Sequence, residues 1–295
     1  MHFEFATAGR MIFGPGSVRE AASIAAGLGH RPLLVTGSTP TRAESLAALL
    51  RAQGVTPAAA LAVPHEPDVE LVRRGTTLAR EARCDVVIGV GGGAVLDTAK
   101  AIAGLATNPG DVLDYLEVIG RGETLRFPAL PTVAVPTTAG TGSEVTRNSV
   151  ITSPAHKVKV SLRSPLLLPK AAVVDPELTY DLPPLLTATT GLDALAQLLE
   201  PFVCTRANPL TDGLCREALP RVARSLRRAV EDGHDAAARE DMALASLFGG
   251  LALANAGLGA VHGLAAPLGG LLEAPHGALC AALLPAVVAG NLEAL

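Results

Sequence analysis

The stretch DVVIGVGGGAVLDTAK, residues 85–100, combines an expected strand, a glycine turn and the start of a helix. The strand expected over 85–90 is apolar after its first residue, which is typical of a strand buried on both faces of a sheet. The glycines at 91–93 let the backbone approach an anion closely. The helix expected over 94–106 adds free N–H groups and the positive end of its dipole. The segment therefore predicts a pyrophosphate site, and a tight turn without a ligand is the alternative.

The regions around this stretch repeat the alternation of apolar strand and amphipathic helix. Further strands are expected over 32–36, 58–63 and 132–135, and further helices over 42–53 and 69–83. Apolar strands separated by helices indicate a parallel sheet covered on both faces, and right-handed crossovers make such a sheet doubly wound. We therefore expect a Rossmann-like α/β fold.

The composition changes near residue 175, and the segment DLPP at 181–184 interrupts the chain. The segments after it are rich in Ala, Leu and Gly at helical spacing, and none reads as a strand. We expect a doubly wound α/β dinucleotide-binding domain over 1–182, followed by an all-α domain over 183–295. The run 278–295 is apolar and stops without a closing element. We therefore expect that a C-terminal portion is missing from this sequence, a short natural variant being the alternative.

A second loop, PTTAGTGSE at 136–144, follows the strand expected over 132–135. Its small residues and hydroxyl groups can bind phosphate oxygens or a ribose, although Thr141 or Ser143 could simply cap a helix. Ligands of doubly wound sheets bind at the carboxyl ends of the strands. Because both loops follow strands of one sheet, we expect them to converge at that edge.

Composition and charge exclude several classes of protein. Of 295 residues, 49% are hydrophobic and 18% charged, which excludes a disordered chain, and the net charge of −4 argues against a nucleic-acid binder. Four scattered cysteines and the absence of a signal peptide predict a cytoplasmic protein. Residues 242–272 carry no charge and are long enough for a membrane span. Their glycines, His262 and Pro267 favour buried helices instead, and no membrane partner is expected.

Five motifs resemble the iron-containing alcohol dehydrogenase family. They are GGGAVLDTAK (91–100), PTTAGTGSE (136–144), GLDAL from Gly191 with Glu200, GAVHGLAAPLGG (259–270) and APHG (274–277). The resemblance covers almost the whole chain and implies an α/β dinucleotide domain followed by a helical domain. Family members are usually longer at the C-terminus.

The resemblance implies that NAD(H) or NADP(H) binds between the two domains. Gly92, Gly93, Ala94 and Asp97 would hold the pyrophosphate and nearby groups, and Lys159 would lie near the ribose, a surface strand lysine being the alternative. Three threonines would line the cofactor: Thr137, Thr138 and Thr141.

The end of the strand over 32–36 bears on the choice of cofactor. Members strict for NAD tend to carry an Asp where this chain has Gly37. The loss of that carboxylate, with donors from Ser38, Thr39 and Arg42, favours NADP(H) or a relaxed choice.

The family metal site uses one Asp and three His. Asp193, His262 and His276 match three of these positions, and Gln197 occupies the fourth. Residues i and i+4 share a helix face, so Gln197 would still point at the site, but a neutral amide is a poorer ligand than imidazole. We therefore expect a divalent ion, iron or zinc, that is held weakly. The position of a family histidine linked to proton transfer holds Ala266 here.

The favoured function is an NAD(P)-dependent oxidoreductase that interconverts a small alcohol and its aldehyde or ketone. His262 and His276 are the expected catalytic residues, through a metal or as acids. The alternatives are a dehydroquinate-synthase-like lyase and a cofactor-binding module with a decayed catalytic site. Cys280 is expected to be a buried thiol. Phenylalanines in or near a short N-terminal strand predict a homodimer or larger homo-oligomer, since a second chain would cover that edge.

Overall fold

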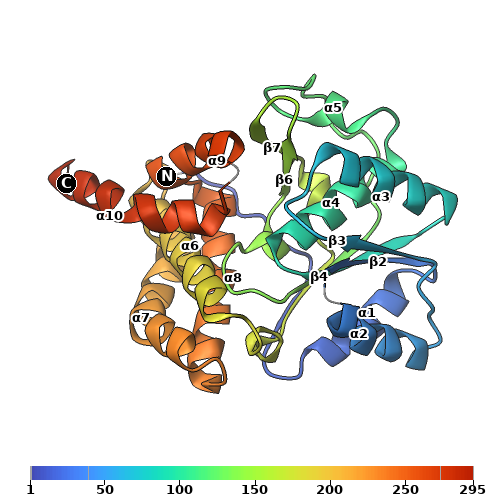
Figure 1. The fold of residues 1–295 in the computed structure, drawn as a ribbon, viewed down its shortest axis with the longest axis horizontal. Helices are drawn as coiled ribbons and strands as arrows, with labels where there is room; N and C mark the ends of the chain where they lie inside the picture. The colour runs from blue at the N-terminus through green and yellow to red at the C-terminus, as the bar shows by residue number, and fades with distance from the viewer. Residues whose placement is uncertain (1, 39, 273, 295) are drawn as a thin grey trace.

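The computed structural model describes residues 2–38, 40–272 and 274–294. Within these ranges a parallel sheet has the strand order β1-β8-β5-β4-β2-β3 (Figure 1). Its strands are β1 (Met11–Phe13), β2 (Pro32–Gly37), β3 (Ala59–Val63), β4 (Val86–Gly91), β5 (Thr132–Pro136) and β8 (Ala171–Val174).

Helices cover both faces of the sheet because its strands direct alternate apolar side chains to opposite sides. Leu34 and Ile88 belong to the core with the first pair of helices, whereas Leu33 and Val87 belong to the core with the second pair. These helices are α1 (Val18–Leu28), α2 (Pro40–Ala52), α3 (Val69–Glu81) and α4 (Gly93–Thr107). The doubly wound arrangement expected from the sequence is confirmed.

The chain reverses its direction of winding around β2, which lies between β3 and β4. The connection after β2 leads outwards to β3, and the chain then crosses back to β4, β5 and β8. A reversal of this kind opens a crevice at the carboxyl ends of the two strands involved. Here those ends are Gly37 and Gly91, and the glycine turn follows the second.

The expected strands and helices of the sheet are confirmed to within about two residues. The sequence analysis did not find β8 or the antiparallel hairpin of β6 (Asn148–Ser153) and β7 (Val158–Arg163), which is separate from the sheet. The segment NSVITS of β6 alternates half-buried and buried residues, a period-2 signal that was available. Short connecting elements are α5 (Val112–Tyr115), η1 (Ser143–Val145), η2 (Pro165–Leu167) and η3 (Pro176–Thr179).

The expected N-terminal strand is shorter than its phenylalanines suggested. Phe13 lies in β1, but Phe3 and Phe5 precede it in an extended segment. Phe5 and Phe13 pack against a buried cluster that includes Ala172 and Leu247. Residues distant in the sequence therefore cover these two side chains, and the homo-oligomer expected from this strand stays a prediction.

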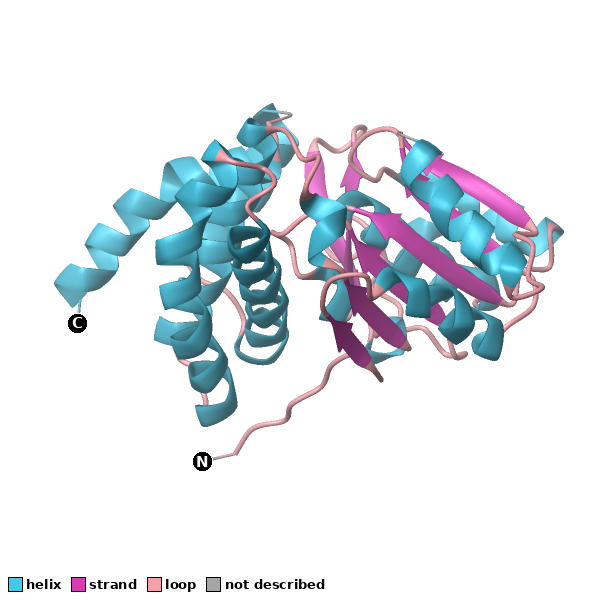
Figure 2. Ribbon diagram, turned by 90° about the horizontal axis from the view of Figure 1, so that it is seen from below, coloured by secondary structure: helices cyan, strands magenta, loops and turns pink. Residues whose placement is uncertain are grey.

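The region after the sheet is helical, as expected (Figure 2). Its first three helices pack around a core that includes Leu198, Cys215, Val222 and Met242. The helices are α6 (Pro184–Val203), α7 (Pro209–Glu231), α8 (Ala236–Ala256), α9 (Ala260–Leu272) and α10 (His276–Ala294).

The uncharged stretch 242–272 is divided between α8 and α9, which meet at an angle of 97°. Most of α8 is buried, which confirms the reading of this part as a core helix. By length and composition the window His276–Glu293 of α10 could cross a membrane, and only 11% of it is buried. The outer face of α10 is thus apolar and uncovered by the described residues.

The two regions meet where the loop after β5 touches α8. Gly142 has a left-handed backbone (φ 59°), and a Cβ there would lie 2.3 Å from the Cα of Gly250. A Cβ at Gly250 would lie 2.6 Å from the carbonyl oxygen of Gly142. Both positions therefore require glycine, because two backbones approach without a layer of side chains between them.

The substitution Gly250→Ala should lower the free energy of unfolding by about 2 kcal/mol, since the new methyl group meets backbone that cannot yield. The matched control is Gly213→Ala in α7, where a Cβ meets nothing within 4 Å. That change should be neutral or stabilise the protein by up to about 1 kcal/mol. Urea denaturation of both variants measures the difference, and equal midpoints would contradict the tight contact.

Candidate functional site

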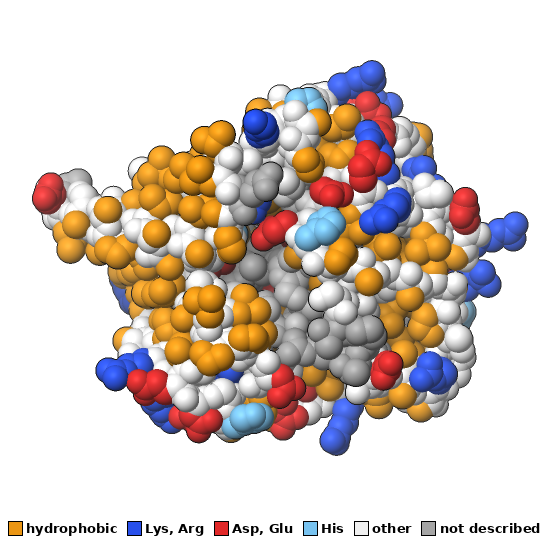
Figure 3. Space-filling model, in the orientation of Figure 1, with side chains coloured by type: hydrophobic (Ala, Val, Ile, Leu, Met, Phe, Trp, Pro, Cys, Tyr) orange, Lys and Arg blue, Asp and Glu red, His pale blue; other side chains and the backbone are white. Residues whose placement is uncertain are grey.

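A cavity of about 700 Å³ lies between the carboxyl edge of the sheet and the helical region. Figure 3 shows the hollow between the two halves of the molecule, with hydrophobic side chains gathered over the helical half. Every candidate residue from the sequence lines this one cavity. They are Gly37, Ser38, Gly92, Gly93, Ala94, Asp97, Thr137, Thr138, Thr141, Lys159, Asp193, Gln197, His262 and His276. Of the two further donors suggested for a 2′-phosphate, Thr39 and the side chain of Arg42 lie outside what the structure describes.

One wall is made by the two glycine-rich and threonine-rich loops. β4 ends at Gly91 and α4 begins at Gly93, so the first N–H groups of the helix face the cavity without helical partners. A Cβ on Gly93 would lie 2.6 Å from the Thr141 methyl group, and one on Gly92 would lie 3.1 Å from that of Thr138. The two loops therefore converge at the sheet edge as the sequence predicted, and the glycines make room for that approach.

Asp97 and Lys100 of α4 tie down the segment that follows the second loop. One Asp97 oxygen accepts a hydrogen bond from the Ser143 hydroxyl, and the other accepts from the Val150 N–H at 2.9 Å. The fully buried Lys100 ammonium pairs with Asp97 at 3.0 Å and donates to the Ser143 and Asn148 carbonyl groups. Asp97 is thus occupied by the protein itself, and its direct contact with a cofactor stays a prediction. The sequence analysis did not identify Lys100, although it lies three residues after Asp97 on the same helix face.

Lys159 extends from β7 towards the same cavity. Its side chain is only 7% exposed, and its ammonium lies 3.6 Å from a carboxylate oxygen of Glu66. Its methylene groups pass close to Gly269 of α9. The alternative of a surface lysine therefore does not fit, and the charge at this position is directed at the cavity and its rim.

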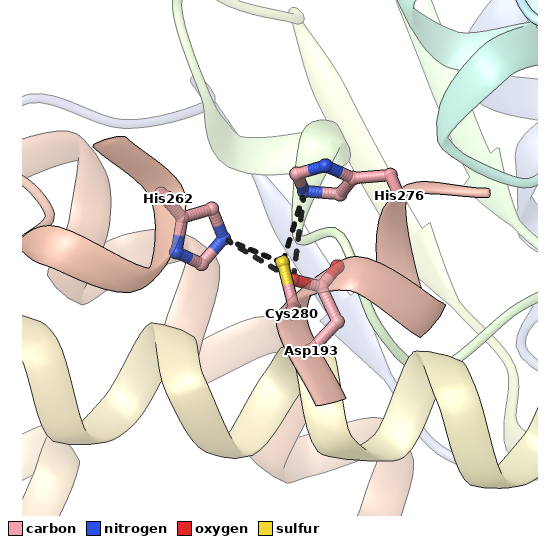
Figure 4. Close-up of side chains that lie close together, drawn as sticks. All are labelled: Asp193, His262, His276 and Cys280. Atoms are coloured by element: carbon pink, nitrogen blue, oxygen red, sulfur yellow. Dashed lines mark hydrogen bonds and ion pairs between the residues drawn. The ribbon is translucent and has the colours of Figure 1, made fainter. Parts of the chain in front are cut away.

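The opposite wall gathers donor atoms from three helices (Figure 4). The Nε2 atoms of His262 in α9 and His276 in α10 lie 3.2 and 3.7 Å from Oδ1 of Asp193 in α6. Cys280 completes the cluster, and each of the four residues offers a donor atom within 4.8 Å of the others. The expected burial of Cys280 is confirmed, but its place among these donors was missed. Its position four residues after His276 was the available signal.

The charges of this cluster depend on one another. Burial alone would raise the pKa of Asp193, but hydrogen bonding with His262 and the nearby His276 holds it below its usual value. Burial alone would lower the pKa of His262, but its bonds with Asp193, Cys280 and Glu200 raise it. An imidazole between two carboxylates marks a point where positive charge is favoured, whether from a proton or from a metal ion.

Glu200 of α6 positions His262. One carboxylate oxygen accepts the N–H of Val261 at 2.6 Å, and the other is hydrogen-bonded to Nδ1 of His262. The carboxylate thus satisfies a free N–H at the start of α9 and favours the imidazole tautomer that leaves Nε2 for the cluster. The sequence analysis noted Glu200 within a motif and gave it no role.

The two departures from the family pattern both lie at this wall. Gln197 is 3% exposed, and its Oε1 has no hydrogen-bond partner among the described residues. Ala266 lines the cavity without a group that could carry a proton. A buried acceptor without a donor costs free energy, so Gln197 Oε1 marks a place that a cation would satisfy.

The substitution Glu200→Gln should weaken metal binding by roughly 10- to 100-fold, since the amide keeps an acceptor for Val261 but loses the charge that orients His262. Zinc titration against a competing chelator measures this effect, and circular dichroism checks that the helices persist. Glu231→Gln, an exposed carboxylate in α7, is the matched control. Unchanged zinc affinity in Glu200→Gln would rule out this positioning role.

Two family models cover nearly the whole chain. Residues 8–176 match iron-containing alcohol dehydrogenase, and residues 187–295 match the C-terminal part of the Fe-containing alcohol dehydrogenase family. Long-chain-alcohol dehydrogenase 1 of Geobacillus thermodenitrificans (strain NG80-2) is 45% identical over 239 residues. That match covers 81% of this chain and 60% of that protein, so the chain matches less than two thirds of that relative's length.

Solved structures of similar proteins agree with these family matches. A 1,3-propanediol oxidoreductase superposes with a TM-score of 0.93 at 39% identity, covering 100% of this chain and 77% of that one. The sulfoacetaldehyde reductase of Bifidobacterium kashiwanohense, in complex with NAD+, has a TM-score of 0.91 at 32% identity, covering 99% and 77%. By sequence and by fold, this chain belongs to the iron-containing alcohol dehydrogenase family.

Proposed function

We propose that this protein is an NAD(P)-dependent oxidoreductase that interconverts a small alcohol and its aldehyde or ketone. The observation that carries the proposal is the single cavity, which joins an anion-binding helix terminus on one wall to a cluster of metal-binding donors on the other. The dehydrogenase and reductase names of the similar proteins support it. We also propose that the cavity lies between two domains divided at residue 182.

The first wall fits a dinucleotide. The glycine turn before α4 lines the cavity with backbone, and the free N–H groups of the helix favour a pyrophosphate. Thr137 and Thr138 follow β5 and extend this wall towards the donor cluster. When bound, the nicotinamide supplies or accepts the hydride. The NAD+ in the sulfoacetaldehyde reductase structure supports this assignment.

The second wall fits a divalent metal ion. Asp193, His262 and His276 offer an anionic oxygen and two imidazole nitrogens. Gln197 lies on the same helix as Asp193, and its Oε1 has no hydrogen-bond partner within the described ranges. Iron and zinc both accept such donors. When bound, the ion supplies Lewis acidity that polarises the substrate oxygen.

The protein itself positions the reacting groups and excludes water from the site. Hydride transfer requires two carbons held in contact, in a site from which water is excluded. The cavity lining also includes Leu186, Leu253 and Leu258, which make part of it apolar. Glu200 meanwhile holds the His262 ring in place.

In the protein without metal, His276 is the group we assign to proton exchange. Its side chain is 32% exposed, against 11% for His262, so it can exchange protons with solvent. Burial lowers its pKa, but Cys280 and Asp193 raise it overall, which favours a proton on the ring. In the protein without metal, His276 is placed to donate a proton to a developing alkoxide, and His262 to stabilise its charge.

The direct test is oxidation of NADH or NADPH in the presence of a panel of small aldehydes and ketones. We expect turnover with at least one of them, and Gly93→Ala should weaken cofactor binding by roughly tenfold or more because its methyl group meets Thr141. Gly213→Ala is the matched control. Cofactor binding without turnover of any carbonyl compound would favour the alternative, a cofactor-binding module with a decayed catalytic site. Absence of cofactor binding would contradict the proposal.

We propose that the protein prefers NADP(H) to NAD(H), or accepts both. Gly37 lines the cavity at the end of β2, a Cβ there meets nothing within 4 Å, and Ser38 follows it as a donor. An Asp at 37 thus fits sterically and would face a 2′-phosphate. Gly37→Asp should favour NADH over NADPH by a further tenfold, roughly, through charge repulsion. Fluorescence titration of both cofactors measures the ratio, with Gly27→Asp as the charge-matched control, and an unchanged ratio would contradict the proposal.

A cytoplasmic location is also proposed. All four cysteines are free, and Cys84, Cys215 and Cys280 are buried. Free thiols are the ordinary state of cysteine in a reducing compartment, which supports this location.

We propose that the protein is a homodimer through the edge of its sheet. β1 pairs with β8 on one side, and no strand of the described ranges pairs with its other side. Met11 in this edge is 43% exposed. Light scattering should give twice the mass of the chain, and Met11→Lys should shift it towards the monomer, because charge on an edge strand opposes pairing. Leu185→Lys, at an exposed position of α6, is the control. A monomeric wild type would contradict the proposed homodimer.

A further inference from the structure

The donor cluster contains one atom that the family pattern of Asp and His does not require, the sulfur of Cys280. It lies 3.6 Å from Nε2 of His276 and 3.9 Å from Nε2 of His262. Cys280 is fully buried, and its helix α10 also carries His276 one turn earlier. The thiol therefore faces the same point as both imidazoles and Asp193 (Figure 4).

The separations in this cluster are those of atoms that share a metal ion. Tetrahedral bonds to zinc place neighbouring nitrogen and oxygen ligands about 3.3 Å apart, and nitrogen and sulfur about 3.6 Å apart. The corresponding distances here are 3.2 and 3.7 Å to Asp193, and 3.6 and 3.9 Å to Cys280. Mutual hydrogen bonding accounts for three of these contacts but not for the fourth, because 3.7 Å between nitrogen and oxygen is too long for a hydrogen bond.

A second observation points to a cation at the same wall of the cavity. Gln197, where the family carries an imidazole, is 3% exposed and has an Oε1 atom without a partner among the described residues. It is one turn from Asp193 on α6 and lines the same cavity. The amide is neutral, so a strong fourth donor must come from elsewhere, and within the cluster Cys280 supplies an atom that can carry a negative charge.

We propose that Cys280 binds the metal ion as a thiolate, in place of the imidazole that Gln197 lacks, and that this makes the site prefer zinc to iron. A thiolate is a soft, anionic ligand of the kind that zinc favours in mononuclear sites. Binding forms a bond between sulfur and the ion, and the thiol proton leaves to solvent. The weak metal binding that the sequence predicts from Gln197 then applies to iron and not to zinc. The inference rests on the proposed function only in placing a metal ion at this cluster.

Cobalt(II) provides the test, because a thiolate bound to it gives a charge-transfer band in the near ultraviolet that nitrogen and oxygen ligands do not. The reduced 295-residue protein is titrated with cobalt(II) without oxygen, beside Cys280→Ala and the matched Cys215→Ala, a buried cysteine of α7 outside the cluster. The wild type, Cys215→Ala and Gln197→Leu should show the band. Cys280→Ala should lose it, together with roughly tenfold or more in affinity, since loss of even an outer partner costs that much.

A rescue variant and a competition between two metals give further tests of the thiolate ligand. Gln197→His in the Cys280→Ala background should restore cobalt binding without the band, because it returns an imidazole to α6. With equal zinc(II) and iron(II), elemental analysis should find mainly zinc in the wild type and a smaller preference in Cys280→Ala. X-ray absorption of the zinc-loaded wild type should find one sulfur ligand, which keeps the test valid even if a variant fails to fold.

The outcomes separate this inference from the proposed function. Cobalt bound without the band, a band that survives in Cys280→Ala, or zinc without a sulfur ligand would overturn the thiolate ligand. Carbonyl reduction by the same samples would leave the proposed function standing in each case. Failure to bind cobalt or zinc would overturn the inference and the metal-assisted mechanism together, and NAD(P)H binding by that sample would still support the cofactor wall.

Discussion

The loop from Thr137 to Gly142 is held between α4 and α8, by threonine side chains on one side and by backbone contact on the other, and the cavity depends on this constraint. On one side the loop threonines leave no space for side chains on the glycine turn before α4, and on the other Gly142 touches the backbone of Gly250. Contacts of this kind have little tolerance, because no flexible side chain can adjust between them. They fix the distance between the start of α4 and the donor cluster, and the proposed hydride transfer would need that distance to be constant.

Buried charges reinforce the same geometry, and each has fixed partners. Lys100 lies under the second loop and is neutralised by Asp97, while its remaining protons go to carbonyl and hydroxyl oxygens. Asp193 and Glu200 are buried on the other wall, and both contact His262. Charges in a low-dielectric interior are tolerated only with such partners, so these groups hold the surrounding segments in one arrangement. Two carboxylates around one imidazole also make this wall favourable for positive charge.

The departures at the positions matched to the family metal and proton-transfer residues, Gln197 and Ala266, lie at the wall of the donor cluster. The dinucleotide wall keeps its glycines and threonines, whereas the metal wall has an amide at 197, a methyl group at 266 and a thiol at 280. Changes at an ion site alter the ligand chemistry without altering the fold, because the helices that carry the donors are packed by other residues. The chain thus combines an ordinary cofactor fold with an unusual set of donors.

The sequence by itself determined the local elements of this protein. The apolar run before the glycine turn predicted β4 and α4 within about two residues, because hydrophobic period and glycine chemistry act over a few positions. The i, i+4 spacing likewise placed Asp193 and Gln197 on one face of α6. The same spacing relates His276 to Cys280 in α10, so that pair was available from the sequence.

Only the tertiary structure decided which of these elements meet. The contact of Gly142 with Gly250 and the meeting of Asp193 with Cys280 join segments about 90 to 110 residues apart, and nothing in local periodicity encodes such distances. The turning of the Asp97 carboxylate towards Ser143 and Val150 follows from how the second loop packs on α4. The physical reason is the same in each case: spacing along the chain sets the face of a helix, whereas packing of the cores sets what that face touches.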